Sequence, residues 1–322
     1  MKMPSMIKQA QQYLKFKRKL GYQLDSEGKE LLLFARYADQ IGHKGPVTTE
    51  IAVRWAKLPE NADPVYWARR YEVVCRFAKH QFLFDSRTEI PPKRLLGSSK
   101  RRLSPHIYSH DEVAALLQAA SRLKPTDGLQ PRTYVALFGL LLSTGLRISE
   151  ALNLSRDDVD FKMSIVTVNQ TKFKKSRLVP ISPSTSQALQ DYVTFRDACH
   201  PGVKVEGFFL TKNGTSLNYG QVLYVFKKLR LDLGWTDTGK RPPRIHDVRH
   251  TFAVRRLLKW YEEGKNLDQK IFALSTYMGH AQVTDTYWYL SAVPALLAVV
   301  SQRFEIFVNS QGGGNIYEQK QI

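Results

Sequence analysis

The stretch from Arg244 to Tyr289 concentrates side chains that can bind a phosphate and move protons. Its first run, R-I-H-D-V-R-H-T-F-A-V, contains His246 and Arg249, and its last run, Y-M-G-H-A-Q-V-T-D-T-Y-W-Y-L-S, contains His280. Arginine forms paired hydrogen bonds to phosphate, histidine exchanges protons near neutral pH, and a tyrosine hydroxyl can act as a covalent nucleophile. Together these residue types indicate phosphoryl-transfer chemistry.

A second cluster lies upstream, in the run T-G-L-R-I-S-E-A-L-N-L. Arg147 is the only basic residue between Val135 and Leu154, and an unpaired guanidinium in so apolar a stretch is costly. Glu150, three residues on, could be its structural ion-pair partner. The alternative is that Arg147 and Arg249 point into one cavity and hold a single phosphate between them.

Two patterns in the chain invite a metal site. His246 and His250 are four residues apart, as in the H-E-x-x-H zinc motif, but Asp247 stands where that motif has glutamate. A neighbouring arginine would also bring positive charge beside the metal. The run Asp157–Asp160 could hold magnesium, although a capping and turn cluster is the preferred interpretation there. We therefore predict no metal and no other cofactor.

Phosphoryl transfer without a metal needs cations, a nucleophile and an acid for the leaving oxygen. A phenol bonded to phosphorus is a good leaving group, so a tyrosine-linked strand can be resealed without ATP. Lys172 lies at the start of a basic turn between two β-rich runs, in I-V-T-V-N-Q-T-K-F-K-K-S-R-L-V-P-I. A lysine in this turn is of the type that can reach a leaving hydroxyl.

The charge of the chain indicates a polyanionic partner. Its 322 residues include 48 Lys and Arg against 29 Asp and Glu, a formal charge of +19, and both halves are net positive. We favour nucleic acid over the alternatives, a merely basic soluble protein or a binder of anionic membrane. The two cysteines, Cys75 and Cys199, form no C-x-x-C pair. No apolar run reaches membrane-spanning length and the first residues lack the apolar core of a signal peptide, so we expect a cytoplasmic, DNA-associated protein.

Hydrophobic periodicity predicts four helices in an N-terminal domain, residues 1–85. In the fourth helix, cationic residues alternate with aromatic ones, which suits a helix that packs on one face and meets phosphates on the other. A solvated basic face is an equally good interpretation of any one such helix. The candidate DNA contacts in this helix are Arg69, Arg70, Arg76 and Lys79. Residues 86–106, with two prolines and a Lys-Arg-Arg run, predict a basic linker.

The second domain, residues 107–307, reads as mainly helical with a small antiparallel sheet. Its predicted strands are the two runs beside the basic turn and a short third run, F-F-L-T, at residues 208–211. Leu296–Phe307 predicts a last apolar helix, which could dock on a neighbouring subunit or pack on its own domain. The final segment, residues 308–322, is predicted to be a flexible tail. The fold class is therefore mainly α with a small sheet.

Four motifs in this order resemble the tyrosine recombinases, the phage-integrase and Xer-like site-specific recombinases. They are T-G-L-R-I-S-E, T-K-x-x-K-S-R-L-V-P-I, H-D-V-R-H-T-F-A, and M-G-H followed by Y-W-Y-L-S. The resemblance covers residues 107–307 and extends more weakly to the N-terminal helices, which look like the family's core-DNA-binding domain. A longer segment before M-G-H, and Met where Leu is commoner, are its departures.

The resemblance assigns roles that the residues alone leave open. Glu150 would orient Arg147, Lys172 would protonate the leaving 5′ oxygen, and Lys174 and Lys175 would contact phosphates. The catalytic set implied by the resemblance is Arg147, Lys172, His246, Arg249, His280 and Tyr289.

The nucleophile must be chosen from two tyrosines. One continuous helix from His280 would place Tyr287, seven residues on, on the same face. Thr284 and Asp285 look like the start of a new helix, so residues after them need not follow the helical periodicity that begins at His280. The family's spacing of nine residues selects Tyr289.

The resemblance also implies a reaction and partners. The protein would cut and rejoin double-stranded DNA through a 3′-phosphotyrosine, as a homo-tetramer on paired sites, with accessory DNA-bending or directionality proteins as further partners. One rival is a type IB-like topoisomerase with the same chemistry, and another is a DNA-binding protein without catalysis. The complete catalytic set argues against the second rival.

Overall fold

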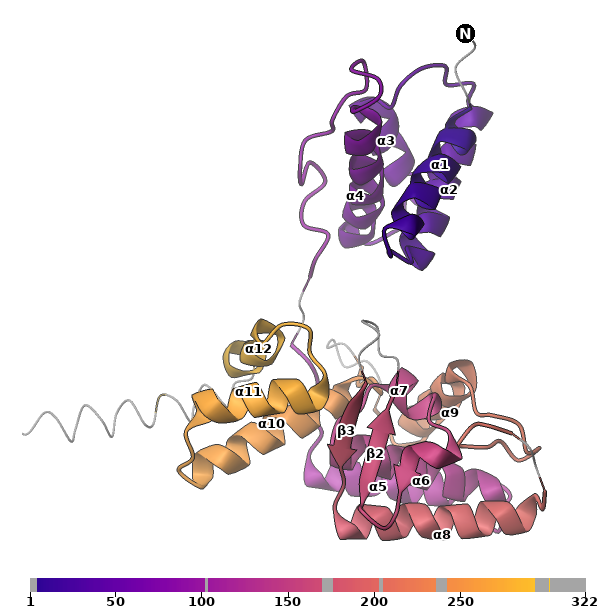
Figure 1. Ribbon diagram of the computed structural model, residues 1–322, viewed down its shortest axis with the longest axis vertical. Helices are drawn as coiled ribbons and strands as arrows, with labels where there is room; N and C mark the ends of the chain where they lie inside the picture. The colour runs from indigo at the N-terminus through magenta and orange to yellow at the C-terminus, as the bar shows by residue number, and fades with distance from the viewer. Residues whose placement is uncertain are drawn as a thin grey trace, which may run out of the picture. The chain divides into compact units, whose positions relative to one another are not determined.

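The structure is a computed structural model in which the chain divides into two compact units, Met1–Leu103 and Ser104–Ile322 (Figure 1). The residues that the structure describes are 5–101, 104–169, 176–202, 205–235, 242–292 and 301, and the side chains of 290–292 are outside this description.

The first unit is a bundle of four helices, as predicted. Ser5, Thr48 and Asp63 accept hydrogen bonds from the first backbone N–H groups of three of these helices, which fixes where the helices begin. Phe34 lies in the hydrophobic core of this unit and packs edge-on against Trp55. The helices are α1 (Met6–Lys19), α2 (Asp25–Gln40), α3 (Thr49–Ala56) and α4 (Pro64–Gln81).

Most of the predicted linker packs on this first unit. The Glu89 backbone N–H donates to Val47 O (3.0 Å), and the Tyr71 hydroxyl donates to Pro92 O (2.9 Å). Arg69 donates to the carbonyl of Ser99 at 3.1 Å. The segment through residue 101 therefore belongs to the N-terminal unit, because its own polar groups bond back to that unit.

Arg70, a predicted DNA contact, lies inside the first unit. Its helical phase places it with the buried Val73, Val74 and Phe77, and its exposed fraction is 8%. Its guanidinium donates to the carbonyl of Trp55 at 3.0 Å and covers that indole at 3.9 Å. We therefore remove Arg70 from the candidate DNA contacts. The other three, Arg69, Arg76 and Lys79, are exposed.

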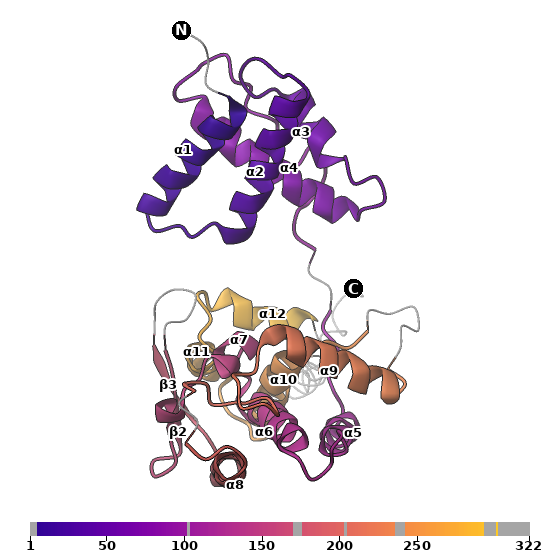
Figure 2. The same ribbon diagram turned by 90° about the vertical axis from the view of Figure 1, so that its right-hand side faces the viewer.

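The second unit is built around a single apolar helix, α6. Leu137, Phe138 and Leu140 are almost completely buried, as expected of a helix that is apolar on all sides. Figure 2 shows α6 between α5 and α8. Helix α6 contacts α5, α7, α8 and α10. The helices of this unit are α5 (His110–Ser121), α6 (Leu129–Thr144), α7 (Ile148–Leu152), α8 (Pro183–Cys199), α9 (Tyr219–Asp232), α10 (Asp247–Glu262), α11 (Leu267–Met278) and α12 (Thr284–Ala292).

A small antiparallel sheet lies beside these helices in the order β1-β2-β3. The predicted hairpin is confirmed: β2 (Ile165–Val168) pairs with β3 (Arg177–Pro180), with Val166 opposite Val179. The two-residue strand β1 (Val159–Asp160) was not predicted, because its residues read as a turn cluster. The predicted capping and turn cluster is also present in part. The carboxylate of Asp158 accepts a hydrogen bond from the backbone N–H of Ser155, the residue that precedes the 3₁₀ turn Arg156–Asp158.

The predicted strand at residues 208–211 is wrong. Leu210 forms only an isolated bridge with Ser216, and the Phe208 N–H donates to Leu154 O. The run is apolar because Phe208 and Phe209 fill the core as an irregular segment. A short apolar run does not distinguish a buried strand from such a segment.

Helices α10, α11 and α12 enclose a third hydrophobic cluster, which contains Phe252, Leu257, Ile271, Met278 and Tyr289. Helix α12 begins at Thr284, so it is separate from the segment that carries His280. No described helix is long and apolar enough to cross a membrane. The predicted helix Leu296–Phe307 and the predicted tail lie outside the described residues, apart from residue 301.

We expect Arg70→Ala to lower the free energy of unfolding by about 2 kcal/mol, since it removes a buried hydrogen bond to the Trp55 carbonyl and a cation–π contact with the Trp55 ring. Arg76→Ala is the matched control, because Arg76 is exposed and its ion pair with Glu72 is also exposed. Urea unfolding of the full chain, followed by tryptophan fluorescence, measures both. Equal stability of the two variants would contradict the structural role of Arg70.

Candidate active site

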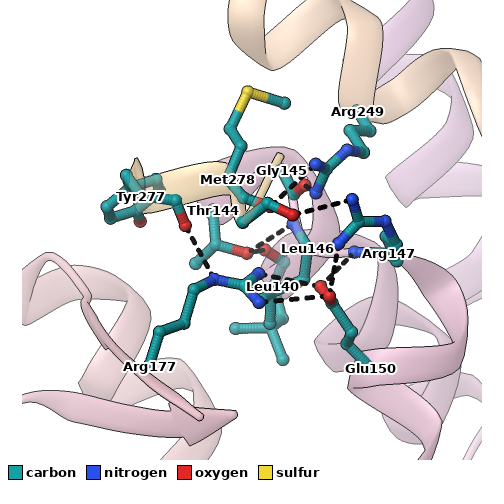
Figure 3. A network of polar contacts seen from close by, with 11 residues as sticks. Leu140, Thr144, Gly145, Leu146, Arg147, Glu150, Arg177, Arg249, Tyr277 and Met278 are labelled. Atoms are coloured by element: carbon teal, nitrogen blue, oxygen red, sulfur yellow. Dashed lines mark hydrogen bonds and ion pairs between the residues drawn. The ribbon is translucent and has the colours of Figure 1, made fainter. Parts of the chain in front are cut away.

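Three arginines from different elements converge on the C-terminal end of α11 (Figure 3). The carbonyls of residues 277–279 have no partner within the helix, and they lie at the negative end of its dipole. Each accepts a hydrogen bond from one guanidinium. The bonds run from Arg177 Nε to Tyr277 O (2.8 Å), from Arg249 Nη2 to Met278 O (2.8 Å) and from Arg147 Nη2 to Gly279 O (2.9 Å).

Gly279 makes this arrangement possible. It ends α11 in the left-handed region, with φ of 67°, and the next N–H, that of His280, donates back to Ser275 O at 3.0 Å. A Cβ on Gly279 would lie 2.7 Å from Nη1 of Arg177. The glycine therefore allows both the turn and the close approach of Arg177.

Glu150 holds two of the arginines together. Its carboxylate accepts from Arg147 Nη1 at 2.7 Å and from Arg177 at 2.8 and 3.1 Å (Figure 3). Burial alone would raise the pKa of Glu150, but the hydrogen bonds from Arg177 and Arg147 outweigh burial and lower this pKa to about 2. Glu150 is therefore ionised at neutral pH. The ion pair between Arg147 and Glu150 is present as the sequence suggested.

Arg249 is buried, with 3% of its surface exposed. Besides its bond to α11 it donates to Gly145 O at 2.7 Å, where α6 ends with φ of 64°. A Cβ on Gly145 would lie 2.4 Å from the ring of Phe252. Burial, and then the charge of Arg147, lower the pKa of Arg249 to about 10. This site is therefore costly for a cation until an anion enters it.

The two predicted histidines have different surroundings. His280 Nδ1 lies 2.7 Å from the hydroxyl of the buried Thr286, and burial and the charges of Arg249 and Arg147 lower the pKa of His280 to about 3. His246 is exposed and directly precedes α10. Its pKa is also lowered, first by partial desolvation and then by Arg249.

The two candidate tyrosines differ in burial and in the contacts of their hydroxyl groups. Tyr289 is 2% exposed, its hydroxyl lies 3.1 Å from His250 Nδ1, and its ring stacks 6.3 Å from that of His280. Burial raises the pKa of Tyr289 to about 12. Tyr287 is 42% exposed, and its hydroxyl contacts Asp268 at 3.4 Å instead.

Three predicted lysines, Lys172, Lys174 and Lys175, lie outside the described residues. The turn that carries these lysines connects β2 to β3. Arg177, the first residue of β3, donates a hydrogen bond to Glu150 and so links β3 to the cluster of arginines. Within the described ranges, no group of three His, Cys, Asp or Glu side chains could hold a metal ion.

Sequence reasoning missed three residues that the structure places in this site. Arg177 lies inside the quoted motif T-K-x-x-K-S-R-L-V-P-I, so the motif itself carried the signal. His250, next to Arg249, was considered only as a metal ligand. Thr286 had no signal in the sequence, since its role depends on how α12 folds back over His280.

Comparison with known proteins agrees with this geometry. The model of the phage integrase family matches residues 107–294. The chain is 38% identical over 302 residues to a Sinorhizobium fredii protein with the provisional name integrase/recombinase y4rB, covering 92% of this chain and 95% of the relative. It is 31% identical over 226 residues to tyrosine recombinase XerC of Chlamydia caviae, covering 69% and 65% of the two chains.

Among solved structures, the fold is similar to that of the Tn1549 transposon integrase in complex with transposon right end DNA. The TM-score is 0.68 at 19% identity, covering 94% of this chain and 99% of the integrase. The chain belongs to the phage integrase family. It is a tyrosine recombinase, an enzyme that breaks and rejoins DNA strands.

Gly279→Ala tests the close approach at the end of α11. Gly264 is the matched control, because its φ of 68° imposes the same strain on alanine, about 1–2 kcal/mol, while nothing lies within 4 Å of its added Cβ. We expect Gly279→Ala to be less stable than Gly264→Ala by a further 1–3 kcal/mol or so, because Arg177 must move. Equal thermal unfolding of the two variants would contradict the packing argument.

The half-buried histidines His250 and His280 predict how the stability of the protein depends on pH. The pKa values of His250 and His280 are about 3 in the folded chain, below the value of about 6.5 of an unfolded histidine. The unfolded state therefore binds protons first, so the free energy of unfolding of the DNA-free protein falls as pH drops from about 6.5 toward 3. Urea unfolding between pH 7.5 and 4.5 measures this fall. A His250→Asn/His280→Asn variant should show a shallower dependence, whereas parallel curves would contradict it.

Proposed function

We propose that this recombinase acts at specific sites on double-stranded DNA and cleaves each strand through a 3′-phosphotyrosine on Tyr289, without metal or ATP. One observation carries the proposal. Among the described residues, Glu150 is the carboxylate that pairs with Arg147 and Arg177, while Arg249 bonds to two backbone carbonyls, and a buried phenol lies beside them. The uncompensated positive charge suits a phosphodiester, and suits still better the more negative pentavalent phosphorane formed when the phenol attacks.

Each side chain near the phenol then has a role at the phosphate. Arg147 and Arg249 bind the two non-bridging oxygens. Arg249 has five N–H donors, and its bonds to Gly145 and Met278 use two of them. His280 faces the phosphate through Nε2, since its Nδ1 is held by Thr286.

The remaining groups act on the leaving oxygen and on the phosphates. The Tyr289 oxygen bonds to phosphorus, the bond from phosphorus to the 5′ oxygen breaks, and Lys172 supplies a proton to that oxygen. Lys174 and Lys175 contact flanking phosphates, and the exposed His246 approaches the phosphate from the start of α10. In rejoining, a 5′ hydroxyl attacks and the phenol leaves, so no ATP is consumed.

The assembly follows from the number of strands. Exchange between two duplexes cuts four strands and each chain supplies one Tyr289, so we propose a homo-tetramer on paired sites. The exposed Arg69, Arg76 and Lys79 of α4 contact the DNA backbone in each protomer. We place this activity in the cytoplasm, with accessory DNA-bending or directionality proteins as additional partners.

A type IB-like topoisomerase would use the same residues but act on one duplex. The two activities differ in their products, because only a recombinase transfers strands between two separate duplexes. The assay uses two labelled duplexes that carry a site selected from random DNA by binding to the full chain. Recombinant products support the proposal, and relaxation of supercoils without such products would favour the topoisomerase.

A nicked suicide site tests the nucleophile, because cleavage beside the nick releases a short fragment and traps the covalent complex. We expect Tyr289→Phe to form no detectable complex, a loss of about 10³-fold or more, since the attacking oxygen is removed. Tyr287→Phe is the matched control and should retain wild-type trapping, because its hydroxyl contacts Asp268 instead. Denaturing gels measure the trapped fraction.

The same assay separates the remaining possibilities. Trapping by Tyr289→Phe at the wild-type level, or its loss in Tyr287→Phe alone, would refute the assignment of Tyr289. Loss of cleavage in EDTA would refute the metal-free mechanism.

A further inference from the structure

His250 is in direct contact with the proposed nucleophile. Its Nδ1 lies 3.1 Å from the Tyr289 hydroxyl, and the two rings are 5.4 Å apart at an angle of 62°. His250 belongs to α10 and directly follows Arg249, so the helix that binds the phosphate also places an imidazole against the phenol. The phenolic proton needs an acceptor when the Tyr289 oxygen bonds to phosphorus.

The other two histidines of the site are arranged differently. His246 lies one helical turn before His250, with ring centroids 5.0 Å apart and the rings nearly perpendicular, so its ring packs against that of His250. His280 stacks at 6.3 Å from the phenol ring, and its Nδ1 is held by Thr286. Of these histidines, His250 is the one whose ring nitrogen is within hydrogen-bond distance of the phenol oxygen.

We propose that His250 is the general base of the reaction: its Nδ1 accepts the phenolic proton as the Tyr289 oxygen bonds to phosphorus. This inference rests on the proposed function, because it takes Tyr289 as the nucleophile. The P–O bond to the 5′ oxygen breaks in the same step, and that oxygen takes its proton from Lys172. In rejoining, the imidazolium returns its proton to the departing phenol, so His250 ends each cycle neutral.

The surroundings keep this base neutral before DNA binds. Burial is the largest cause, and the neighbouring His246, Arg244, Arg249 and His280 add to it, so the pKa of His250 falls to about 3. A neutral imidazole with Nδ1 toward the phenol can accept a proton. The phosphate brings a negative charge into this cluster of cations, which favours the imidazolium at the moment when the phenol becomes more acidic by bonding to phosphorus.

A purely structural role would also place His250 beside the phenol, so the test must separate positioning from proton transfer. Asparagine keeps a hydrogen-bonding atom near the position of Nδ1 but does not take a proton. We therefore expect His250→Asn to bind DNA normally and to slow single-turnover cleavage of the suicide site by about 10²-fold or more. Its rate should rise with pH up to about 9, where the wild-type rate has already levelled.

A substrate with sulfur in place of the scissile 5′ oxygen shows on which side of the phosphorus His250 acts. A thiolate leaves without a proton, so this substrate relieves defects in leaving-group protonation only. We expect the defect of His250→Asn to persist on it. Recovery of the rate on this substrate, or cleavage of the ordinary site within about 3-fold of wild type, would overturn the proposal.

A second variant covers the case in which His250→Asn does not fold. His250→Ala leaves space beside Tyr289, and added imidazole should restore its cleavage in a pH-dependent way. Absence of rescue in folded, DNA-binding His250→Ala would count against the base role, as would a larger pH-dependent defect in His246→Asn. If wild-type protein forms no covalent complex at all, the proposed function fails instead, so the two failures are distinguishable.

Discussion

Three backbone carbonyls at the end of α11 are the constraint on which the site depends. A helix must satisfy its last carbonyls, and here three guanidiniums satisfy them, one from the start of α7, one from β3 and one from α10. The helix end therefore fixes the three cations relative to one another before any DNA arrives. The glycines that end α6 and α11 allow this, because each occupies a left-handed conformation at a point where a neighbouring side chain leaves no space for a Cβ.

The same arrangement leaves the site short of negative charge. Glu150 neutralises part of the charge of Arg147 and Arg177, while Arg249 is buried and bonded only to carbonyls in the described structure. Folding tolerates this because peptide dipoles face the guanidinium, but a dipole does not cancel a full charge. A bound phosphate would supply the missing anion. A site that is strained for the free protein is in this way pre-organised for its substrate and for the transition state.

Much of this could be predicted from the sequence, and the limits have physical reasons. The hairpin of β2 and β3 follows from a local pattern, two β-rich runs around a basic turn, and it is present. Arg70 was misjudged because alternation of charge and aromatics does not fix helical phase, and one position's shift turns a side chain from solvent into the core. The contact of His250 with the phenol depends on the packing of α12 over α10, which no local pattern specifies.

The most direct test of the central claim is the structure of the Tyr289→Phe protein bound to an intact DNA site. We expect the scissile phosphate to lie within hydrogen-bond distance of Arg147 and Arg249, while the bonds of all three arginines to residues 277–279 persist. We also expect the ring of residue 289 to face that phosphorus and His250. A phosphate bound away from the two arginines, or arginines that leave the end of α11 to reach it, would contradict the account.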